Sequence, residues 1–184
     1  MGTRGITKVI YENELKVSQY GQWDHYPSGQ GITVFDFLRG DGNIDKLKNS
    51  IKSNVYKPSV KELDDIYATF ADKDGMMTLE QGESFDKIYP SLSRDTGADI
   101  LNVIANATQP IPLYLDLDFE SDTLMCEGVY TINLDNDTFT TLYDGQETVI
   151  KFEDIYSMGK EDYLVRSKCS VYEYNQGIDK QPVA

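Results

Sequence analysis

The sequence predicts an α+β fold in which an antiparallel sheet carries helices on one face. Two β-type runs near the start, residues 6–11 and 15–20, flank a short turn and predict a hairpin. Apolar residues at helical spacing follow as far as residue 107, and the stretch 113–152 then shows the two-residue alternation of strands. We therefore expect the N-terminal hairpin to join a C-terminal meander, with four to five helices packed across one face.

The helical part is divided by glycines, prolines and capping residues. A loop at residues 21–31, rich in glycine and aromatic residues, follows the hairpin, and Ser28 is expected to cap the next helix. That helix ends at Gly40 and runs through Val34, Phe35, Phe37 and Leu38. Further helices are expected at residues 44–52, 59–70, 79–89 and 93–107.

The strands of the meander are separated by polar turns. Alternation predicts strands at residues 113–119, 129–134 and 138–143, and residues 148–152 and 163–174 complete the β-rich part. The length of 184 residues suits one domain, so we assign 1–184 to a single α+β domain with a frayed polar tail at 175–184.

Composition predicts a globular protein of the cytoplasm. No secretory signal follows Met1, and no run approaches the roughly 20 apolar residues of a membrane-spanning helix, so we expect no membrane association. Cys126 and Cys169 stand in predicted strands outside any Cys-x-x-Cys pattern. Two such thiols in an intracellular chain are more often reduced core residues than a disulfide or a metal site.

The acidity is confined to the later part of the chain. The formal net charge is -14. Residues 1–60 contain eight Lys/Arg and six Asp/Glu, whereas the remainder contains nine against twenty-five. An acidic surface repels nucleic acid, so we expect no direct sequence-specific nucleic-acid binding and favour a basic protein partner. Solubility alone is the simpler explanation of such acidity.

A calcium-loop pattern around Gly75 is incomplete. With Gly75 at position six of an EF-hand loop, Asp72, Asp74 and Thr78 fall at ligand positions three, five and nine. Phe70 and Gln81 then fall at positions one and twelve, where carboxylates are needed. We therefore expect no metal or other cofactor, and favour an Asp-Gly turn between two helices.

Two enzymatic hypotheses involve the N-terminal part. His25 could act as a general base with Asp24 orienting its ring, but a loop histidine packed against aromatic side chains is the more frequent case. Exposure of Thr3 would create a nucleophile with its own α-amino group as base. That requires a cut after Gly2, because removal of Met1 alone exposes a glycine.

A set of carboxylates is a candidate binding surface. On a strand, Asp116 and Asp118 would project from one face roughly 6.5 to 7 Å apart, which is similar to the phosphate repeat of a nucleic-acid strand. Such a row could imitate a phosphate backbone and occupy a basic groove. A solvated acidic sheet face is the simpler interpretation. The complete candidate set is Asp116, Asp118, Glu120, Asp122, Asp135 and Asp137.

Four segments carry a family resemblance: residues 1–5, the Tyr-Gly-Gln-Trp-Asp and Tyr-Pro-Ser-Gly-Gln-Gly sequences within 19–31, residues 93–98, and residues 122–135. They resemble a family of largely uncharacterised proteins of bacteria, their phages and mobile elements. The resemblance extends from the first residue to about Tyr143. His25 stands where glycine is common in that family, and Gly128 where tryptophan is expected.

The resemblance implies an anti-defence function, because small acidic proteins of phages and mobile elements include inhibitors of type II RNA-guided (CRISPR) nucleases. Such a nuclease holds nucleic acid in basic channels and reads its PAM with arginines, which an acidic inhibitor could block. The expected partner is then a Cas nuclease–guide RNA complex, and homodimerisation is a further option.

Two other interpretations remain open. A hydrolase of the N-terminal-nucleophile kind would be centred on Thr3, Arg4, Asp24 and His25. Alternatively the loop motif is structural, with Arg4 paired to Asp24 or Asp95 and Trp23 covering the sheet edge. The residues of that motif are Thr3, Arg4, Gln22, Trp23, Asp24, Tyr26, Arg94 and Asp95.

Overall fold

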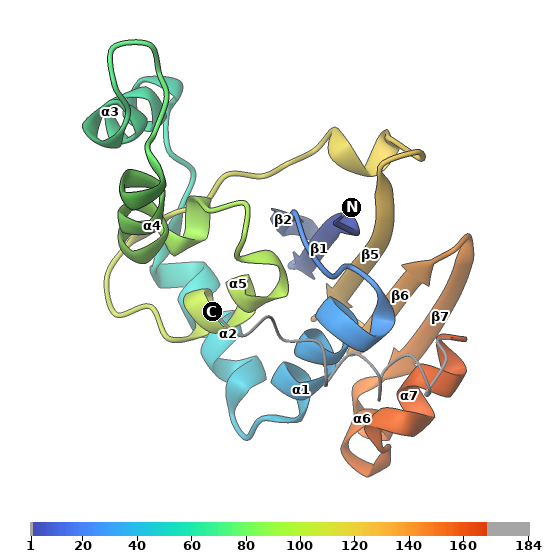
Figure 1. Cartoon of the computed structure of the whole chain (residues 1–184). Helices are drawn as coiled ribbons and strands as arrows, with labels where there is room; N and C mark the ends of the chain where they lie inside the picture. Colours follow the sequence, from blue (N-terminus) through green and yellow to red (C-terminus); the bar gives the residue numbers. More distant parts are fainter. Residues whose placement is uncertain (1, 169–184) are drawn as a thin grey trace.

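The computed structural model describes residues 2–168, and its elements are shown in Figure 1. A five-stranded sheet has the order β2-β1-β5-β6-β7. Its strands are β1 (Arg4–Tyr11), β2 (Glu14–Gly21), β5 (Cys126–Asn133), β6 (Thr138–Tyr143) and β7 (Gln146–Lys151). The predicted α+β class is confirmed, and the N-terminal hairpin joins the meander as expected.

The sheet is mixed and not wholly antiparallel as predicted, because β1 and β5 pair in parallel while the other three neighbouring pairs are antiparallel. Antiparallel neighbours can be joined by tight turns, but a parallel neighbour needs a long crossover connection. Residues 22–125 provide that crossover, and most of the described helices lie within it. The hairpin and the meander therefore meet at the one parallel junction of this sheet.

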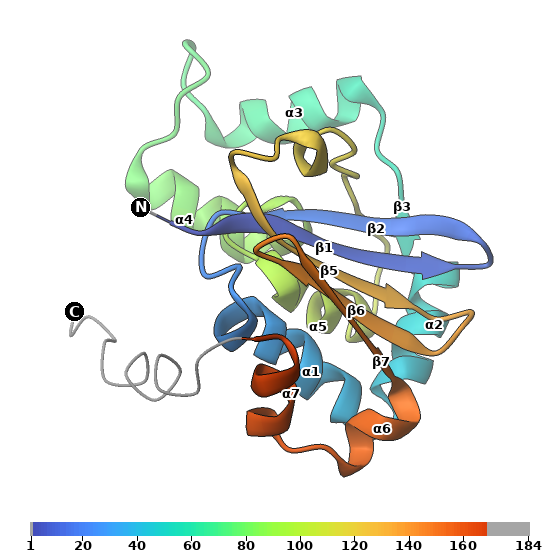
Figure 2. The ribbon, with the colours of Figure 1, turned by 90° about the vertical axis from the view of Figure 1, so that its right-hand side faces the viewer.

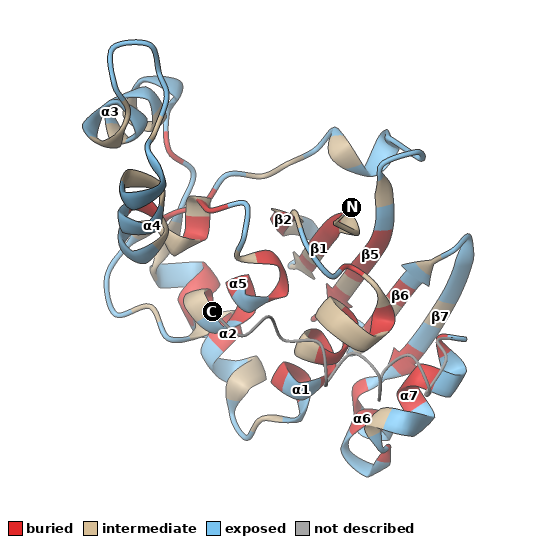
Figure 3. Ribbon diagram, in the orientation of Figure 1, coloured by how far each residue is buried: buried red, intermediate tan, exposed pale blue. Residues whose placement is uncertain are grey.

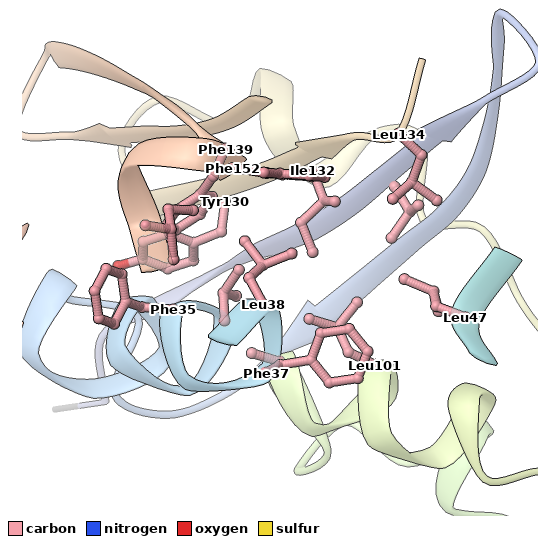
Figure 4. Packing of buried hydrophobic residues seen from close by; sticks show 14 of the residues in the cluster. Phe35, Phe37, Leu38, Leu47, Leu101, Tyr130, Ile132, Leu134, Phe139 and Phe152 are labelled. Atoms are coloured by element: carbon pink, nitrogen blue, oxygen red, sulfur yellow. The ribbon is translucent and has the colours of Figure 1, made fainter. Parts of the chain in front are cut away.

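One face of the sheet is covered by helices, as Figure 2 shows. They are α1 (Ile32–Arg39), α2 (Asn43–Ser53), α5 (Ile100–Ala105), α6 (Phe152–Ser157) and α7 (Lys160–Arg166). Their apolar side chains and the facing strand residues form one buried cluster, part of which is drawn in Figure 4. Stacked rings of Phe35, Tyr163 and Phe139 link α1, α7 and β6. No described helix is both long and apolar enough to cross a lipid bilayer.

A helical arm, which we define as residues 60–88, projects beside this core (Figures 1 and 3). It consists of α3 (Val60–Phe70), α4 (Leu79–Ile88) and the loop between them. No residue of α3 is buried, and Phe85 is the one buried residue of α4. The short strands β3 (Val55–Tyr56) and β4 (Ile111–Pro112) pair in parallel before and after the arm. The arm therefore has little apolar contact with the main core.

The predicted strand at residues 113–119 is wrong. The backbone of this segment follows the free edge of β2, where the Asp116 N–H donates to the Ser18 carbonyl at 2.9 Å. One carboxylate oxygen of Asp116 then accepts hydrogen bonds from the N–H groups of Asp118 and Phe119. These bonds turn the chain into a short 3₁₀ helix, η4 (Phe119–Ser121), which lies over the sheet face opposite the helices.

Other predicted boundaries also change. Ser28 does not cap α1, because it lies inside a π-helical turn, η1 (Pro27–Gly31), that leads directly into that helix. The predicted helix at 93–107 is shorter, since η3 (Gly97–Asp99) precedes α5. The predicted strand at 163–174 is wrong as far as residue 166, which belongs to α7, and its part from 169 lies outside the described residues. The predicted helices at 44–52, 59–70 and 79–89 are confirmed as α2, α3 and α4.

Candidate functional site

The loop at residues 21–31 places His25 against three glycines from three different strands. A Cβ atom at Gly21 would lie 1.9 Å from Cε1 of His25, and one at Gly5 would lie 2.5 Å from its Cδ2. A Cβ atom at Gly128 would lie 2.0 Å from the carbonyl oxygen of His25. The imidazole is fully buried in this cradle. Glycine is required at these positions because the strands and the loop approach too closely for any side chain.

Three hydrogen bonds fix His25 in the cradle. Its N–H donates to the Thr3 carbonyl at 3.0 Å, and its own carbonyl accepts from the Tyr130 hydroxyl at 2.9 Å. Its Nδ1 lies 3.1 Å from the Trp23 carbonyl, a contact that requires a proton on Nδ1. Nε2 is buried and has no hydrogen-bond partner among the described residues.

The environment of His25 makes it a weak and inaccessible base. Burial lowers the pKa of the imidazole to about 4, although the Trp23 carbonyl and the Asp24 charge act in the opposite direction. The ring is therefore neutral near pH 7 and closed to solvent. A general base must reach the proton it removes, and His25 offers no atom to a substrate at the surface. These observations agree with the interpretation of His25 as a loop histidine packed against aromatic side chains, and not as a general base.

The same loop is docked onto residues 94–98. The Gln22 N–H donates to the Arg94 carbonyl at 3.0 Å, and the Trp23 indole N–H donates to the Asp95 carboxylate at 3.0 Å. The Gln30 side chain accepts from the Ala98 N–H at 2.7 Å. Two of the segments that carry the family resemblance are thus adjacent in space and hydrogen-bonded to each other.

The expected pairing of Arg4 with Asp24 or Asp95 is wrong. Asp24 accepts a hydrogen bond from the Tyr26 hydroxyl at 3.0 Å, and Asp95 is engaged by Trp23 and by Arg94, whose Nε lies 3.9 Å away. Within the described residues neither carboxylate forms a salt bridge with Arg4. Asp24 thus has a partner in its own turn, whereas Asp95 is held by its neighbour Arg94 and by Trp23 of the docked loop.

Trp23 does not cover the sheet edge as expected. Its side chain is 49% exposed. Its ring lies so close to the N-terminal segment that a Cβ atom at Gly2 would be 2.4 Å from it. The free edge of β2 is instead followed by the backbone around Asp116. Trp23 therefore joins the N-terminal segment to Asp95 at the protein surface.

The calcium-loop pattern serves as a turn. One Asp72 carboxylate oxygen accepts from the N–H groups of Asp74 and Met76, both at 2.9 Å, and Gly75 has a positive φ of 78°. Thr78 forms the capping box of α4 with Gln81. In the described part of the chain, no group of three His, Cys, Asp or Glu side chains could hold a metal ion. Asp72 thus closes the turn before α4, and Thr78 caps the helix.

The six candidate carboxylates do not form one row. Four precede β5 and two follow it, and an eight-residue strand separates the two groups by roughly 25 Å. Most have partners within the protein: Glu120 pairs with Lys8 at 2.8 Å, and Asp135 accepts from the N–H groups of Glu12 and Asn13 at 2.8 Å. Asp116 and Asp122 bind backbone N–H groups of their own turns. The strand on which the predicted phosphate-like spacing of Asp116 and Asp118 depended is absent from residues 113–119.

The chain also contains a longer acidic feature that is not a short motif. Residues 95–150 contain eleven carboxylates and no lysine or arginine. This cation-free stretch includes the loop before β5, the whole of β5 and β6, and most of β7. The sequence shows this feature as an absence of lysine and arginine between Arg94 and Lys151. Short motifs are defined by the residues they contain, so they do not reveal a residue type that is missing.

A hollow of about 580 Å³ lies between α4 and the segment that follows it. Tyr67, Met77, Leu79, Phe85 and Leu92 supply its apolar lining, and Glu83, Asp86, Arg94 and Asp95 supply its charges. A smaller hollow of about 170 Å³ shares Leu92 and Arg94 with it and continues toward Tyr20 and Tyr114. Arg94 and Asp95 are the motif residues that line these hollows; Thr3, Arg4, Trp23 and Asp24 do not.

Cys126 has no nucleophilic character in this setting. It is half-buried at the start of β5, and burial together with nearby carboxylates raises the pKa of its thiol to about 11. The thiol is therefore protonated near neutral pH, and a protonated thiol is a poor nucleophile. Cys169 lies outside the described residues.

The fold and the site together define an acidic α+β protein with a packed glycine-aromatic loop and an open hollow beside its helical arm. Comparisons with protein-family models, with curated proteins and with solved structures find no match for this chain.

Proposed function

We propose that this protein is a binding protein that inhibits a bacterial defence nuclease by occupying a basic surface of it. The observation that carries the proposal is the cation-free stretch, which contains eleven carboxylates and no lysine or arginine. A surface of one charge raises the association rate with an oppositely charged partner and repels nucleic acid.

The partner proposed is a type II RNA-guided nuclease bound to its guide, in the cytoplasm of a bacterial host. This choice follows the family resemblance and the basic channels of such nucleases. The structure supports a surface-charge mechanism rather than imitation of a phosphate row, because the carboxylates lie in separate turns. Asp118 is one of those that remain exposed, and its carboxylate makes no hydrogen bond with other described residues.

The geometry gives the hydrolase alternative no support. His25 is buried, the Thr3 carbonyl is engaged in fixing it, and the hollows are lined by other residues. Catalysis needs a nucleophile, a base and oxyanion donors around one accessible point. Among the described residues no such convergence includes Thr3, Asp24 and His25.

The test is a binding and cleavage assay with a purified Cas9–guide RNA complex. We expect stoichiometric binding, reduced DNA cleavage, and an affinity that falls as salt rises from about 0.05 to 0.5 M because screening weakens charge attraction. Absence of both binding and inhibition in a panel of Cas9 orthologues would overturn the nuclease proposal.

A matched pair of charge reversals tests the role of the acidic surface. Asp118→Lys alters an exposed position inside the cation-free stretch, and Asp41→Lys makes the same change at an exposed position in the near-neutral first part. We expect Asp118→Lys to slow association several-fold and Asp41→Lys to change it less than about twofold. Equal effects would show that total charge, and not its location, governs binding.

A further inference from the structure

One face of α4 has no partner within the described part of the chain. Leu79, Gly82, Glu83 and Asp86 line the hollow, and their spacing of three, four and seven residues places them along one side of the helix. Leu79 is 82% exposed. Phe85 also lines the hollow, but it is buried there, and its ring stacks on Tyr67 of α3 with a centroid distance of 5.2 Å. The helix thus uses one stripe to hold the arm together and leaves a second stripe open.

Gly82 is the least expected residue of this open stripe. Glycine inside a helix is unfavourable relative to alanine, and it is usually explained by a close neighbour that excludes a side chain. At Gly82 a Cβ atom would meet no atom of residues 2–168 within 4 Å. The intramolecular packing therefore does not require glycine at this position, in contrast with Gly5, Gly21 and Gly128. A glycine in an exposed helix face allows the backbone of another molecule to approach closely.

The charged residues that line the hollow indicate which kind of molecule it could bind. Glu83, Asp86 and Asp95 are carboxylates of its lining, and Arg94 is the one cation in that lining. The arm as a whole carries eight carboxylates against three lysines. A second copy of this chain would bring the same acidic arm and a further net charge of -14, so like charges would face each other. An occupant with lysine or arginine side chains is complementary.

We infer that the hollow is the docking site of an amphipathic, basic helix of a partner protein. Its apolar ridge would pack over Gly82 and beside Leu79, with its lysine or arginine side chains facing Glu83 and Asp86. A volume of about 580 Å³ accommodates several side chains, as expected for a helix laid into a groove. The inference rests on the proposed function in one respect, namely that the partner is basic.

The experiment uses the full chain and two synthetic helical peptides of about 18 residues, with leucines at helical spacing and either lysine or glutamate elsewhere. Binding of each labelled peptide is followed by fluorescence anisotropy. Gly82→Leu fills the hollow, and Ser84→Leu adds the same side chain to an exposed position roughly 200° away around α4. We expect Gly82→Leu to weaken Leu/Lys peptide binding at least about tenfold, and Ser84→Leu less than about twofold.

Thermal unfolding excludes a folding defect as the cause. Leucine favours helix more than glycine does, so the midpoint of Gly82→Leu should equal or exceed that of the unsubstituted protein. Equal peptide affinities of the two variants would overturn the inference. So would comparable binding of the Leu/Glu peptide, or a dimer in gel filtration that Gly82→Leu dissociates, since the occupant would then be a second copy.

A nuclease assay separates failure of this inference from failure of the proposed function. If Gly82→Leu still binds the Leu/Lys peptide, the docking inference fails even where the protein inhibits a Cas9–guide RNA complex. If Gly82→Leu loses peptide binding but still inhibits the complex, the hollow is a docking site separate from the inhibitory interface. If the unsubstituted protein never inhibits the nuclease, yet Gly82→Leu selectively loses peptide binding, the hollow is a docking site for a different partner and the nuclease proposal fails.

Discussion

The contacts around His25 are so close that three neighbouring positions admit no side chain. Gly5, Gly21 and Gly128 come from three strands, and each leaves no room for a methyl group beside His25. Gly82, by contrast, has no neighbour among the described residues where a Cβ atom would lie. These four positions offer a direct comparison of glycines that packing requires and a glycine that packing does not.

Gly21→Ala should destabilise the protein by about 2 to 3 kcal/mol, because its Cβ atom forces His25 out of the cradle. Gly82→Ala should stabilise it by about 0.5 to 1 kcal/mol through helix propensity. Urea denaturation at pH 7 measures both changes. A loss of stability in Gly82→Ala equal to that in Gly21→Ala would contradict this distinction.

Burial of His25 makes the unfolding free energy depend on pH. The folded-state pKa of about 4 lies below the ordinary 6.5, so the unfolded chain binds the proton more readily. The contribution is complete above about pH 6.5 and is lost as the pH falls toward 4. Between pH 7 and pH 5 we expect a loss of about 2 kcal/mol.

His25→Asn supplies the control for that titration. It removes the ionisable ring, so its unfolding free energy should change by less than about 0.5 kcal/mol over the same pH interval, whatever its value at pH 7. Urea midpoints at pH 7, 6 and 5 give both curves. Parallel curves for the two proteins would assign the pH dependence to other groups.

The sequence indicated that His25 is packed inside the protein, but it did not indicate which residues surround it. Its place in a glycine-aromatic loop predicted contact with aromatic side chains, and Tyr130 lies at a ring-centroid distance of 6.0 Å. Gly128, however, is more than a hundred positions away in the chain. No local pattern could reveal that it completes the cradle, because the proximity arises from the pairing of β1 with β5.

At the scale of elements, the arm has the weakest attachment to the rest of the protein. Its aromatic residues, Tyr67, Phe70 and Phe85, contact one another and the adjacent Tyr89, and stay apart from the main cluster. Segments with few buried apolar contacts open at low free-energy cost. The amides of α3 and α4 should therefore exchange with deuterium well before those of β1 and β5.

Thr78→Ala should accelerate this exchange further. The substitution removes the Thr78 half of the capping box at the start of α4, which costs about 1 kcal/mol and corresponds to roughly fivefold faster exchange in the arm. Ser84→Ala, on the same helix, leaves the cap intact and should change exchange little. Hydrogen exchange followed by mass spectrometry resolves the arm from the sheet. Uniform acceleration over the whole chain would mean that the arm and the core unfold together.

Element prediction succeeded where local signals decide the structure and failed where tertiary contacts decide it. Ser59 and Thr78 cap α3 and α4 within two residues of the predicted starts. Residues 113–119 alternate like a strand, yet Leu113 is buried and Leu117 is 63% exposed. The carboxylate of Asp116 bends this segment away from the sheet, so alternation there does not reflect two faces. The parallel pairing of β1 and β5 also depends on the crossover and not on either strand.

At the scale of the whole molecule, self-repulsion opposes folding. The net charge is -14, and the cation-free stretch contains eleven carboxylates with no lysine or arginine among them. Exposed ion pairs such as Lys61–Asp65 and Lys151–Glu153 contribute little to stability and are screened by salt. Repulsion among the remaining charges is screened as well, and it should dominate the response to salt.

Sodium chloride should therefore raise the thermal midpoint of unfolding at pH 7. Most of the gain is expected below about 0.2 M, where the Debye length falls from about 30 Å to less than 8 Å.

Asp118→Asn tests the cause, because it removes one exposed charge from the cation-free stretch without disturbing a side-chain hydrogen bond to a described residue. Its midpoint should be higher than that of the unsubstituted protein at 0.01 M salt and should rise less as salt is added. Calorimetric scans over a salt series measure both proteins. A midpoint that falls with salt would mean that the ion pairs contribute more to stability than the repulsion removes.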